Sequence, residues 1–481
     1  MGELVDYQIA IDRRRNKRGS WKHARERLLD EVWPVITPSF ELTPGAKIFT
    51  IGSCFARNIE EHLQRLGFDI PMIKFQVPAE EWPERANGIL NKYTPPSICQ
   101  EIEWAKKIMV RDGIVRESDC ADFRFDCGGD FCIDTNLCRF ILVTRSRYFE
   151  RRCQIFELYK ELFTSDCVVM TLGLIEAWFD REKGLYIQET PGGKNFSQQT
   201  QRFAFEVLSY GQCRDYVQRS LDAVHELNPN VKFLLTTSPV PLLRTFTADD
   251  VITANSHSKA VLRAVAGDIA AANVATDYFP SYESVTGTKN WQIWSDDLIH
   301  VSDAFVGKVV SRLTDIYCPG IQQSRKKYLD FYMASKGDDL NEALELGEQL
   351  TETNSPEYLE RLSQVLERKG DINAAVNELR KALDQAPAEP RLRFQYSKLL
   401  AQSGRMQDAL SEARYGVALD PTNLRYRRHL VTLYAHDRNY IKALSQRVLA
   451  ALYRRQSRTQ NVTLKRLLQL VCHQGITAQK S

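Results

Sequence analysis

The feature that most constrains the fold of this chain is an internal repeat with a period of 34 residues in its last third. Equivalent positions recur at this offset, namely Gly370 and Gly404, Pro387 and Pro421, and the series Ala375, Ala409 and Ala443. A fixed period of this length is typical of architectures in which each repeat is one pair of helices. A single pair cannot bury its apolar face, so neighbouring pairs stack and leave a concave surface for an extended ligand. The sequence therefore predicts an all-helical repeat domain over residues 323–455.

The repeat unit resembles the tetratricopeptide repeat, which has small residues where its two helices meet and a proline after the second helix. Three copies are readable, beginning at residues 370, 404 and 438. A segment at residues 340–350 keeps the helical pattern without the period, and we expect it to act as a cap. The resemblance implies a protein partner on the repeats.

Charge is nearly balanced over the chain, with 64 Lys and Arg against 61 Asp and Glu and a net charge of +3. Such a balance gives no field that would draw in nucleic acid or an anionic membrane. The final segment, residues 456–481, is basic. No aromatic side chains interleave with its charges, so we interpret it as a solvated helix or tail rather than a nucleic-acid site.

Residues 1–39 form a polar N-terminal extension without the apolar segment of a signal peptide. No window of the sequence reaches the roughly 18 apolar residues of a membrane span. We therefore expect a cytoplasmic protein with no nucleic-acid partner and no membrane span.

Between residues 40 and 322, short apolar runs alternate with helical patterns. The runs at residues 46–51, 167–172 and 231–236 are typical of strands, and residues 55–66 and 215–227 of helices. Such alternation predicts a parallel sheet with helical crossovers, in which ligands bind beyond the carboxyl ends of the strands. Ser53, Gly173 and Ser238 lie within two residues of the ends of the three runs, so they stand where a site would form.

Four of the eleven cysteines lie close together, at Cys120, Cys127, Cys132 and Cys138. The gaps between them do not fit the two to four residues that usually separate paired zinc ligands, and no histidine is near. We interpret them as reduced cysteines of a β-rich insertion. No glycine-rich phosphate loop follows a strand either, so the sequence predicts neither a metal nor a cofactor.

Residues 52–56 read Gly-Ser-Cys-Phe-Ala, the signature after which the GSCFA family is named. Further blocks that resemble the family follow in order, at residues 88–98, 171–173, 237–240, 255–260, 278–283 and 297–302. The family is similar to the SGNH/GDSL hydrolases, which are serine esterases on a flavodoxin-like sheet. The resemblance therefore implies a flavodoxin-like α/β domain of the SGNH type over residues 40–322.

Ser53 is the predicted nucleophile, because it follows a strand and opens a helix, whose N-terminus favours a developing oxyanion. His300 is the candidate base, and Asp297 three residues earlier can fix the tautomer of its ring. An N-cap serine is the alternative interpretation of Ser53. Cys54 is the alternative nucleophile, although at the start of the helix we expect it to turn toward the sheet as a buried thiol.

The resemblance also implies an oxyanion hole made from the serine amide, a glycine amide and an asparagine side chain. By the order of the blocks, Gly88 supplies the glycine amide. The asparagine should stand two residues after Gly173, but that position is Ile175. Asn91 is a substitute, or the hole has two donors; losing one donor costs about 10² to 10³ in turnover in a characterised serine protease.

Two further residues are candidates for contact with the substrate. Glu176 follows the strand at 167–172, where it lines the cleft or packs against its neighbours. His257 contacts the substrate or caps the helix that follows it.

Together these residues predict a serine-dependent esterase or acyl-ester hydrolase. The acylated substrate is guessed to be an O-acylated carbohydrate, polysaccharide or other glycoconjugate, by association with relatives. One alternative is an O-acyltransferase with the same serine site, and another is a binding protein with a degenerate hydrolase domain and partner-binding repeats. The missing asparagine favours the binding protein, whereas Ser53, Asp297 and His300 favour an enzyme.

Overall fold

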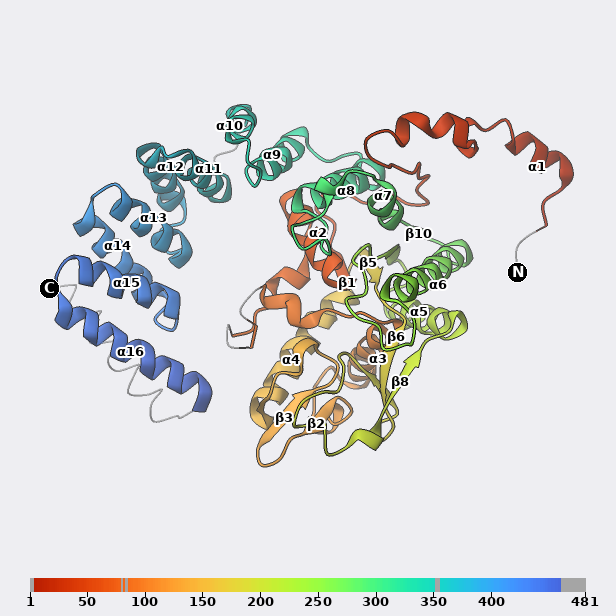
Figure 1. Cartoon of the computed structure of the whole chain (residues 1–481), viewed down its shortest axis with the longest axis horizontal. Helices are drawn as coiled ribbons and strands as arrows, with labels where there is room; N and C mark the ends of the chain where they lie inside the picture. The colour runs from red at the N-terminus through yellow and green to blue at the C-terminus, as the bar shows by residue number, and fades with distance from the viewer. Residues whose placement is uncertain (1–3, 79–80, 83–84, 351–354, 460–481) are drawn as a thin grey trace. The chain divides into compact units, whose positions relative to one another are not determined.

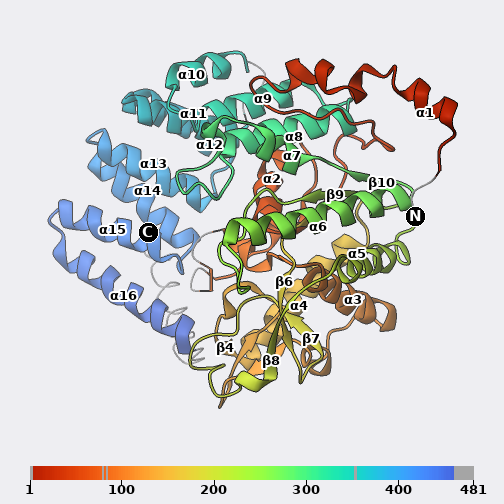
Figure 2. The same cartoon turned by 45° about the vertical axis from the view of Figure 1, so that its right-hand side comes forward.

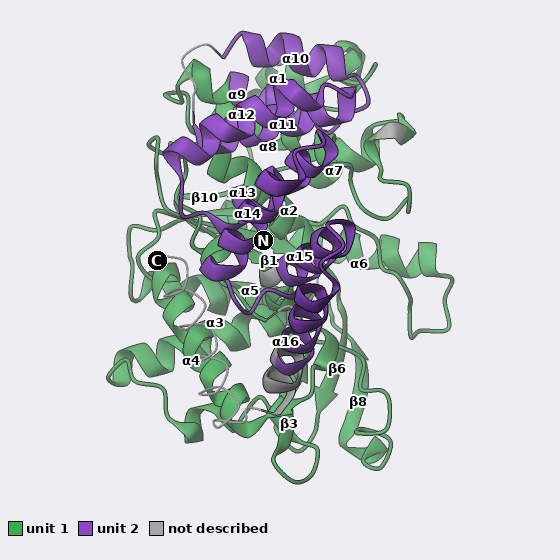
Figure 3. Cartoon of the chain, turned by 90° about the vertical axis from the view of Figure 1, so that its left-hand side faces the viewer, with its two compact units in different colours: residues 1–326 green, residues 327–481 purple. Residues whose placement is uncertain are grey.

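The computed structural model describes residues 4–78, 81–82, 85–350 and 355–459 (Figure 1). The chain divides into two units, Met1–Lys326 and Lys327–Ser481, which Figure 3 shows in different colours. Within the described residues, the strands belong to the first unit. No described helix is both long enough and apolar enough to span a bilayer. The predicted boundary after residue 322 stays a prediction, and the basic tail at 460–481 lies outside the described residues.

The first unit is built around a parallel sheet with the strand order β1-β5-β9-β10. These strands span Ile48–Gly52 (β1), Cys167–Leu172 (β5), Lys232–Thr237 (β9) and Thr276–Tyr278 (β10). A single parallel bridge joins Lys47 to Asp69 at the outer edge of β1. The order is therefore that of a flavodoxin-like sheet whose second strand is reduced to one bridge. This confirms the predicted fold class.

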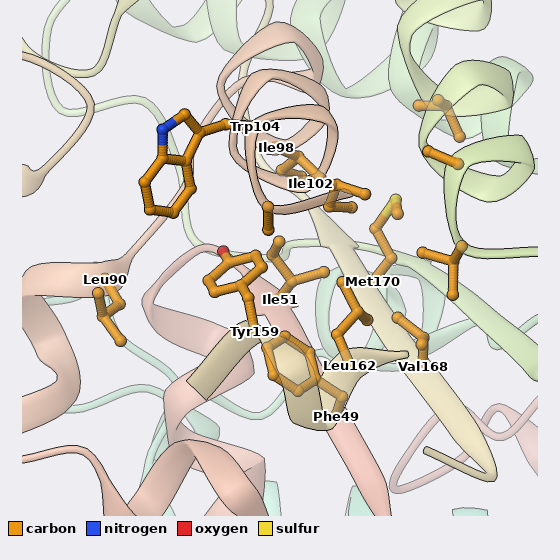
Figure 4. Packing of buried hydrophobic residues seen from close by; sticks show 14 of the residues in the cluster. Phe49, Ile51, Leu90, Ile98, Ile102, Trp104, Tyr159, Leu162, Val168 and Met170 are labelled. Atoms are coloured by element: carbon orange, nitrogen blue, oxygen red, sulfur yellow. The ribbon is translucent and has the colours of Figure 1, made fainter. Parts of the chain in front are cut away.

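One face of the sheet is covered by α3 (Pro95–Arg111), α4 (Arg145–Leu162), α5 (Tyr210–His225) and α6 (Val251–Ala272). Alternate strand residues point to this face, so Phe49 and Ile51 pack there with Met170 of β5 (Figure 4). Figure 2 shows α6 running alongside β9 and β10. Because helices cover both faces, β1 and β5 are buried along their whole length, as the apolar runs predict.

The opposite face of the sheet packs against α2 (Cys54–Arg65), which in turn packs against α8 (Asp303–Tyr317). Thr50 points to this side, where its hydroxyl donates to the carboxylate of Glu60 in α2. The apolar residues Phe55, Ile59 and Leu63 recur at helical spacing and are buried. Helix α2 therefore begins where the sequence predicts, directly after β1.

Two antiparallel sheets lie beside the central one. They contain β2 (Arg124–Asp126), β3 (Phe131–Asp134) and β4 (Val143–Thr144), and β6 (Glu176–Asp180), β7 (Leu185–Ile187) and β8 (Phe203–Val207). Of the four clustered cysteines, Cys132 lies in β3, Cys127 directly follows β2, and Cys120 and Cys138 lie in the short 3-10 helices on either side; all four are free thiols. No group of three or more metal-ligating side chains is present among the described residues.

Part of the N-terminal extension packs onto the α/β unit. It contains α1 (Tyr7–Arg13) and the 3-10 helices η1 (Lys17–Gly19) and η2 (Trp21–Arg27). Further along, Trp33 stacks on Phe305 of α8 with ring centroids 5.5 Å apart, and the Val32 amide donates to Thr288 at 2.9 Å. The second half of the N-terminal extension is thus part of the folded unit.

The remaining elements of the first unit connect these layers. They are α7 (Ser281–Gly287) and the 3-10 helices η3 (Pro71–Lys74), η4 (Ala86–Leu90), η5 (Glu117–Cys120), η6 (Cys138–Phe140), η7 (Thr200–Arg202) and η8 (Trp291–Ile293).

The second unit is a series of helix pairs. These are α11 (Pro356–Lys369) with α12 (Ile372–Gln385), α13 (Pro390–Gln402) with α14 (Met406–Leu419), and α15 (Leu424–His436) with α16 (Tyr440–Thr459). Equivalent helices begin 34 residues apart, and consecutive helices contact one another. Before them, α10 (Leu340–Glu348) follows α9 (Gln323–Ala334), which spans the unit boundary, and neither keeps this period. The predicted tetratricopeptide-like repeat domain is confirmed.

Candidate functional site

The carboxyl ends of the three longest parallel strands meet at one edge of the central sheet. Gly52 pairs with Thr171, and Leu172 pairs with Thr237, so the residues that follow β1, β5 and β9 become neighbours. Gly52 has a φ of +136°, and a Cβ on it would lie 2.2 Å from the carbonyl oxygen of Thr171. Only glycine permits this approach, which brings Ser53 against the next strand.

The hydroxyl of Ser53 makes two hydrogen bonds that hold the residue at the end of β1. Its Oγ donates to Ser238 Oγ at 3.0 Å and accepts from the amide of Phe55 at 3.3 Å. The side chain is only 3% exposed and is the N-cap of α2. These contacts are those of a capping serine. Among the described residues, no hydrogen bond joins Ser53 to His300, so its role as nucleophile stays a prediction.

Cys54 is the first residue of α2 and is half-buried. The expectation that its thiol turns away into the sheet as a buried side chain was wrong. The helix begins with Cys54, so its side chain stands beside the strand ends, where His300 reaches it. Within the described part of the chain, the backbone N–H of Cys54 has no acceptor.

Asp297 and His300 form a hydrogen-bonded pair in the turn that precedes α8. His300 Nδ1 lies 2.6 Å from Asp297 Oδ2, and Asp297 Oδ1 accepts from the amides of Ile299 and His300 at 2.9 Å each. Leu298 between them has a φ of +55°, the left-handed conformation that folds the carboxylate back onto the ring. The predicted Asp-x-x-His pair is therefore present as a geometric unit.

His300 contacts the Cys54 thiol as well as Asp297. The hydrogen bonds to Cys54 and to Asp297 raise the pKa of His300 to about 9, although partial burial opposes the change. With Nδ1 bound to the carboxylate, the second ring nitrogen is the one available to the thiol. The pKa of Asp297 is held below its ordinary value, chiefly by the hydrogen bond from His300. At neutral pH the ring therefore carries a proton beside a carboxylate and a thiol.

Lys259 of α6 lies next to the same thiol and is 1% exposed. Its Nζ donates to the carbonyl oxygens of Gly173 and Val240, both at 2.7 Å. Burial lowers the pKa of Lys259 to about 7, and the Coulomb attraction of the Cys54 thiol opposes that shift. The amine thus ties the segments after β5 and β9 together beside Cys54.

The oxyanion donors expected from the sequence are not free in this arrangement. The N–H of Gly88 donates to the Arg85 carbonyl at 2.8 Å within η4. Ile175 is 1% exposed in the core, and its own amide donates to Ser258 Oγ at 3.1 Å. Asn91 is buried, and its Nδ2 faces the hydroxyl of Tyr93 at 3.5 Å.

Gly173 stands where three segments converge. A Cβ at this position would lie 2.7 Å from the carbonyl oxygen of Tyr93 and 3.5 Å from the Cβ of Ser53. Its carbonyl accepts from Lys259. The glycine is therefore needed for space, which explains its position at the end of β5.

Glu176 and His257 make their contacts away from the Cys54 thiol. Glu176 accepts from Thr245 Oγ1 at 2.6 Å and from the Phe246 amide at 2.9 Å, so it anchors the loop after β9. His257 is exposed in the second turn of α6 rather than ahead of the helix. The block at 255–260 reaches the site through Ser258 and Lys259.

Tyr93 is the residue near Cys54 that sequence reasoning missed altogether. It lies in an irregular segment between η4 and α3, with no strand or helical period to indicate its direction. The Cys54 thiol is one of the groups that act on its hydroxyl. Its place inside the block at residues 88–98 that resembles the family was the one available signal.

Comparison with solved structures finds repeat proteins that match the C-terminal region. MamA MSR-1 is 18% identical, covering 32% of this chain and 91% of that chain with a TM-score of 0.28. YrrB, a TPR protein with an unusual peptide-binding site, is 18% identical, covering 34% of this chain and 79% of its own with a TM-score of 0.26. No curated protein matches the chain.

The α/β unit has a family match of its own. The GSCFA family model matches residues 47–313. The matched region begins at the first residue before β1 and ends within α8, so it includes Cys54, Lys259, Asp297 and His300. Because the match extends over more than half of the 481 residues, the chain belongs to the GSCFA family.

Proposed function

We propose that this hydrolase-like domain transfers acyl groups through a covalent thioester on Cys54. His300 is the proton partner of the thiol in this proposal, and Asp297 orients the imidazole. The observation that carries it is the pair of contacts made by His300, with Cys54 on one side and Asp297 Oδ2 at 2.6 Å on the other. A nucleophile, a base and an orienting carboxylate in that order are the parts that nucleophilic catalysis needs.

In the first half-reaction, the Cys54 thiolate, whose proton has passed to His300, attacks the acyl carbonyl carbon, and the C=O electron pair moves onto oxygen. When the tetrahedral intermediate collapses, the bond to the leaving oxygen breaks, and that oxygen takes the proton of His300. The pKa of His300, raised to about 9 by Cys54 and Asp297, keeps this proton available at neutral pH. The product is an acyl thioester on Cys54 and a released alcohol.

In the second half-reaction, an oxygen nucleophile replaces the thiol. His300, now neutral, accepts a proton from water or from an acceptor hydroxyl, whose oxygen attacks the thioester carbon. Cys54 leaves as the thiolate and the acid or the new ester departs. Water makes the domain an esterase, and a hydroxyl acceptor makes it an O-acyltransferase.

The substrate class in this proposal is an oxygen ester, with an O-acylated carbohydrate as the substrate suggested by the family resemblance. Ser53 is the competing nucleophile. Its hydroxyl is committed to the cap of α2 and to Ser238, which disfavours it. A domain that only binds its ligand would have no use for the proton held between His300 and Cys54.

The test is whether 4-nitrophenyl acetate forms an acyl-enzyme. The measurements are the rate of ester turnover and the mass of the modified peptide. Cys54→Ala should abolish both the adduct and the turnover. Ser53→Ala should cost about 1 kcal/mol of stability through the lost cap while the adduct still forms on Cys54. Cys153→Ala is the matched control, since Cys153 is a free, half-buried cysteine on α4.

Two results would overturn this proposal. An adduct that survives in Cys54→Ala and disappears in Ser53→Ala would make Ser53 the nucleophile. A wild-type chain that forms no adduct and turns over no ester would favour the binding protein.

We also propose that the second unit binds a segment of a partner protein. A hollow of about 210 Å³ lies among α11, α13 and α15, and Glu367, Phe394, Lys398 and Arg425 contribute to its lining. Charges of both signs beside an aromatic ring suit an extended peptide with mixed charge. The hollow lies on the first helices of successive pairs, where stacked repeats form their concave surface.

A further inference from the structure

We infer that the hydroxyl of Tyr93 is an oxyanion donor of this site and takes the place of the asparagine side chain that is missing after Gly173. The inference rests on the proposed acyl transfer, and it names a catalytic residue that the sequence did not reveal. The site is short of oxyanion donors. The Gly88 N–H is bound to Arg85, and the side chain of Ile175 is aliphatic and buried.

The backbone around Tyr93 is fixed at the ends of two strands. The amide of Lys92 donates to the Gly52 carbonyl at 2.8 Å, at the end of β1. The carbonyl of Tyr93 accepts from the amide of Leu174 at 2.7 Å, just after β5. Tyr93 therefore bridges the two strand ends between which the nucleophile stands. The missing asparagine would have projected from this same segment after β5.

A buried ion pair holds this bridge in place. The Nζ of Lys92 donates to Glu101 Oε2 at 2.8 Å, and both side chains are at most 1% exposed. Glu101 is also bound by Arg152 at 2.6 Å. A buried pair with both partners present resists displacement, because separating it leaves an uncompensated charge. The segment that carries Tyr93 is thus rigid, as an oxyanion donor requires.

The hydroxyl of Tyr93 has a proton to donate. Asn91 Nδ2 approaches its oxygen at 3.5 Å, so the oxygen accepts there, and the Cys138 thiol is a further hydrogen-bond partner. Sulfur is a weak acceptor, which a negatively charged oxygen would readily displace. The Cys138 thiol, burial and the Cys54 thiol hold the pKa of Tyr93 above its ordinary value, so the phenol stays protonated.

Tyr93 and the N–H of Cys54 would then act together. When the thiolate adds to the carbonyl carbon, the developing oxyanion accepts one hydrogen bond from the Cys54 amide at the start of α2 and one from the Tyr93 hydroxyl. Both donors strengthen as negative charge develops, so they lower the barrier more than they tighten substrate binding. No proton is transferred from Tyr93 in this step.

The experiment compares two reactions of Cys54 in Tyr93→Phe, which removes a single oxygen atom. Hydrolysis of 4-nitrophenyl acetate forms an oxyanion, and its kcat should fall about 10²- to 10³-fold with KM little changed. Alkylation of Cys54 by iodoacetamide displaces iodide and forms no oxyanion, so its rate should change by less than about twofold. The two rates separate a donor to the oxyanion from a residue that acts on the thiol.

The matched control is Tyr159→Phe, which removes a buried hydroxyl in the core under α4 that makes no hydrogen bond within the described residues. It should leave both rates unchanged. The inference is overturned if Tyr93→Phe keeps wild-type kcat, or if esterolysis and alkylation fall together. If Cys54→Ala keeps its turnover while Tyr93→Phe loses it, the nucleophile was misassigned but the donor stands.

Discussion

His300 shows how two neighbours set the ionisation of one residue. Its pKa is raised from 6.5 to about 9 by the hydrogen bonds to Cys54 and Asp297. A group whose pKa is raised on folding stabilises the fold fully below its unfolded pKa, and that contribution is lost as the pH rises through the folded value. The relevant window therefore lies between pH 6.5 and about 9.

This window gives a prediction for stability. The melting temperature of the wild-type chain should fall between pH 6.5 and 9 relative to that of His300→Gln, which lacks the titrating ring. Asp297→Asn keeps the ring but loses the charged partner, so its decline should be smaller and should end at lower pH. Thermal melts of the three chains across this range make the measurement. Parallel curves for wild type and His300→Gln would mean that folding does not raise the pKa of His300.

At the scale of the elements, the same turn position recurs after the first helix of each of the three repeats. Gly370 and Gly404 lie in the turns after α11 and α13 with φ values of +90° and +83°, and Arg438 occupies the equivalent place after α15 with a φ of +57°. A side chain in this left-handed conformation costs about 1 kcal/mol or more, whereas glycine adopts it freely. The third repeat therefore carries strain that the first two avoid.

Arg438→Gly should raise the free energy of unfolding by about 0.5 to 1 kcal/mol, because it removes this strain at some cost in chain entropy. Gly404→Ala should lower it by about 1 kcal/mol for the converse reason. Urea denaturation of the full chain, followed by circular dichroism, makes the comparison. Arg438→Ala is the control, since it removes the same side chain but keeps the Cβ. A gain of equal size in that variant would trace the effect to the arginine instead.

For the whole molecule, the division into two units predicts separable activities. A chain ending at Lys326 keeps the sheet, α2, α6 and the turn with Asp297 and His300. It should fold, melt cooperatively and retain ester turnover within about twofold, because a unit with its own core folds alone. The same truncation should abolish binding of any protein partner that the repeats capture. An insoluble or inactive product would show that the α/β unit depends on the repeats.

The sequence by itself determined the first three strands of the central sheet, the repeats and the fold class. Apolar runs, helical spacing and a period of 34 residues are local patterns, and local backbone preferences and burial follow them directly. The Asp297–His300 pair was equally predictable, because three residues of one turn bring the two side chains together.

Only the tertiary structure decided which neighbours these residues acquire. Ser53 and Cys54 are adjacent in sequence, yet the meeting of the ends of β1 and β9 commits the serine hydroxyl to Ser238 and leaves the thiol to His300. Backbone hydrogen bonds from Lys92 to Gly52 and from Leu174 to Tyr93 place Tyr93 at the strand ends. No periodic pattern in the sequence encodes such contacts. The physical reason is that parallel strands bring together residues 65 or 119 positions apart, so the direction of a side chain depends on packing that no short window of sequence contains.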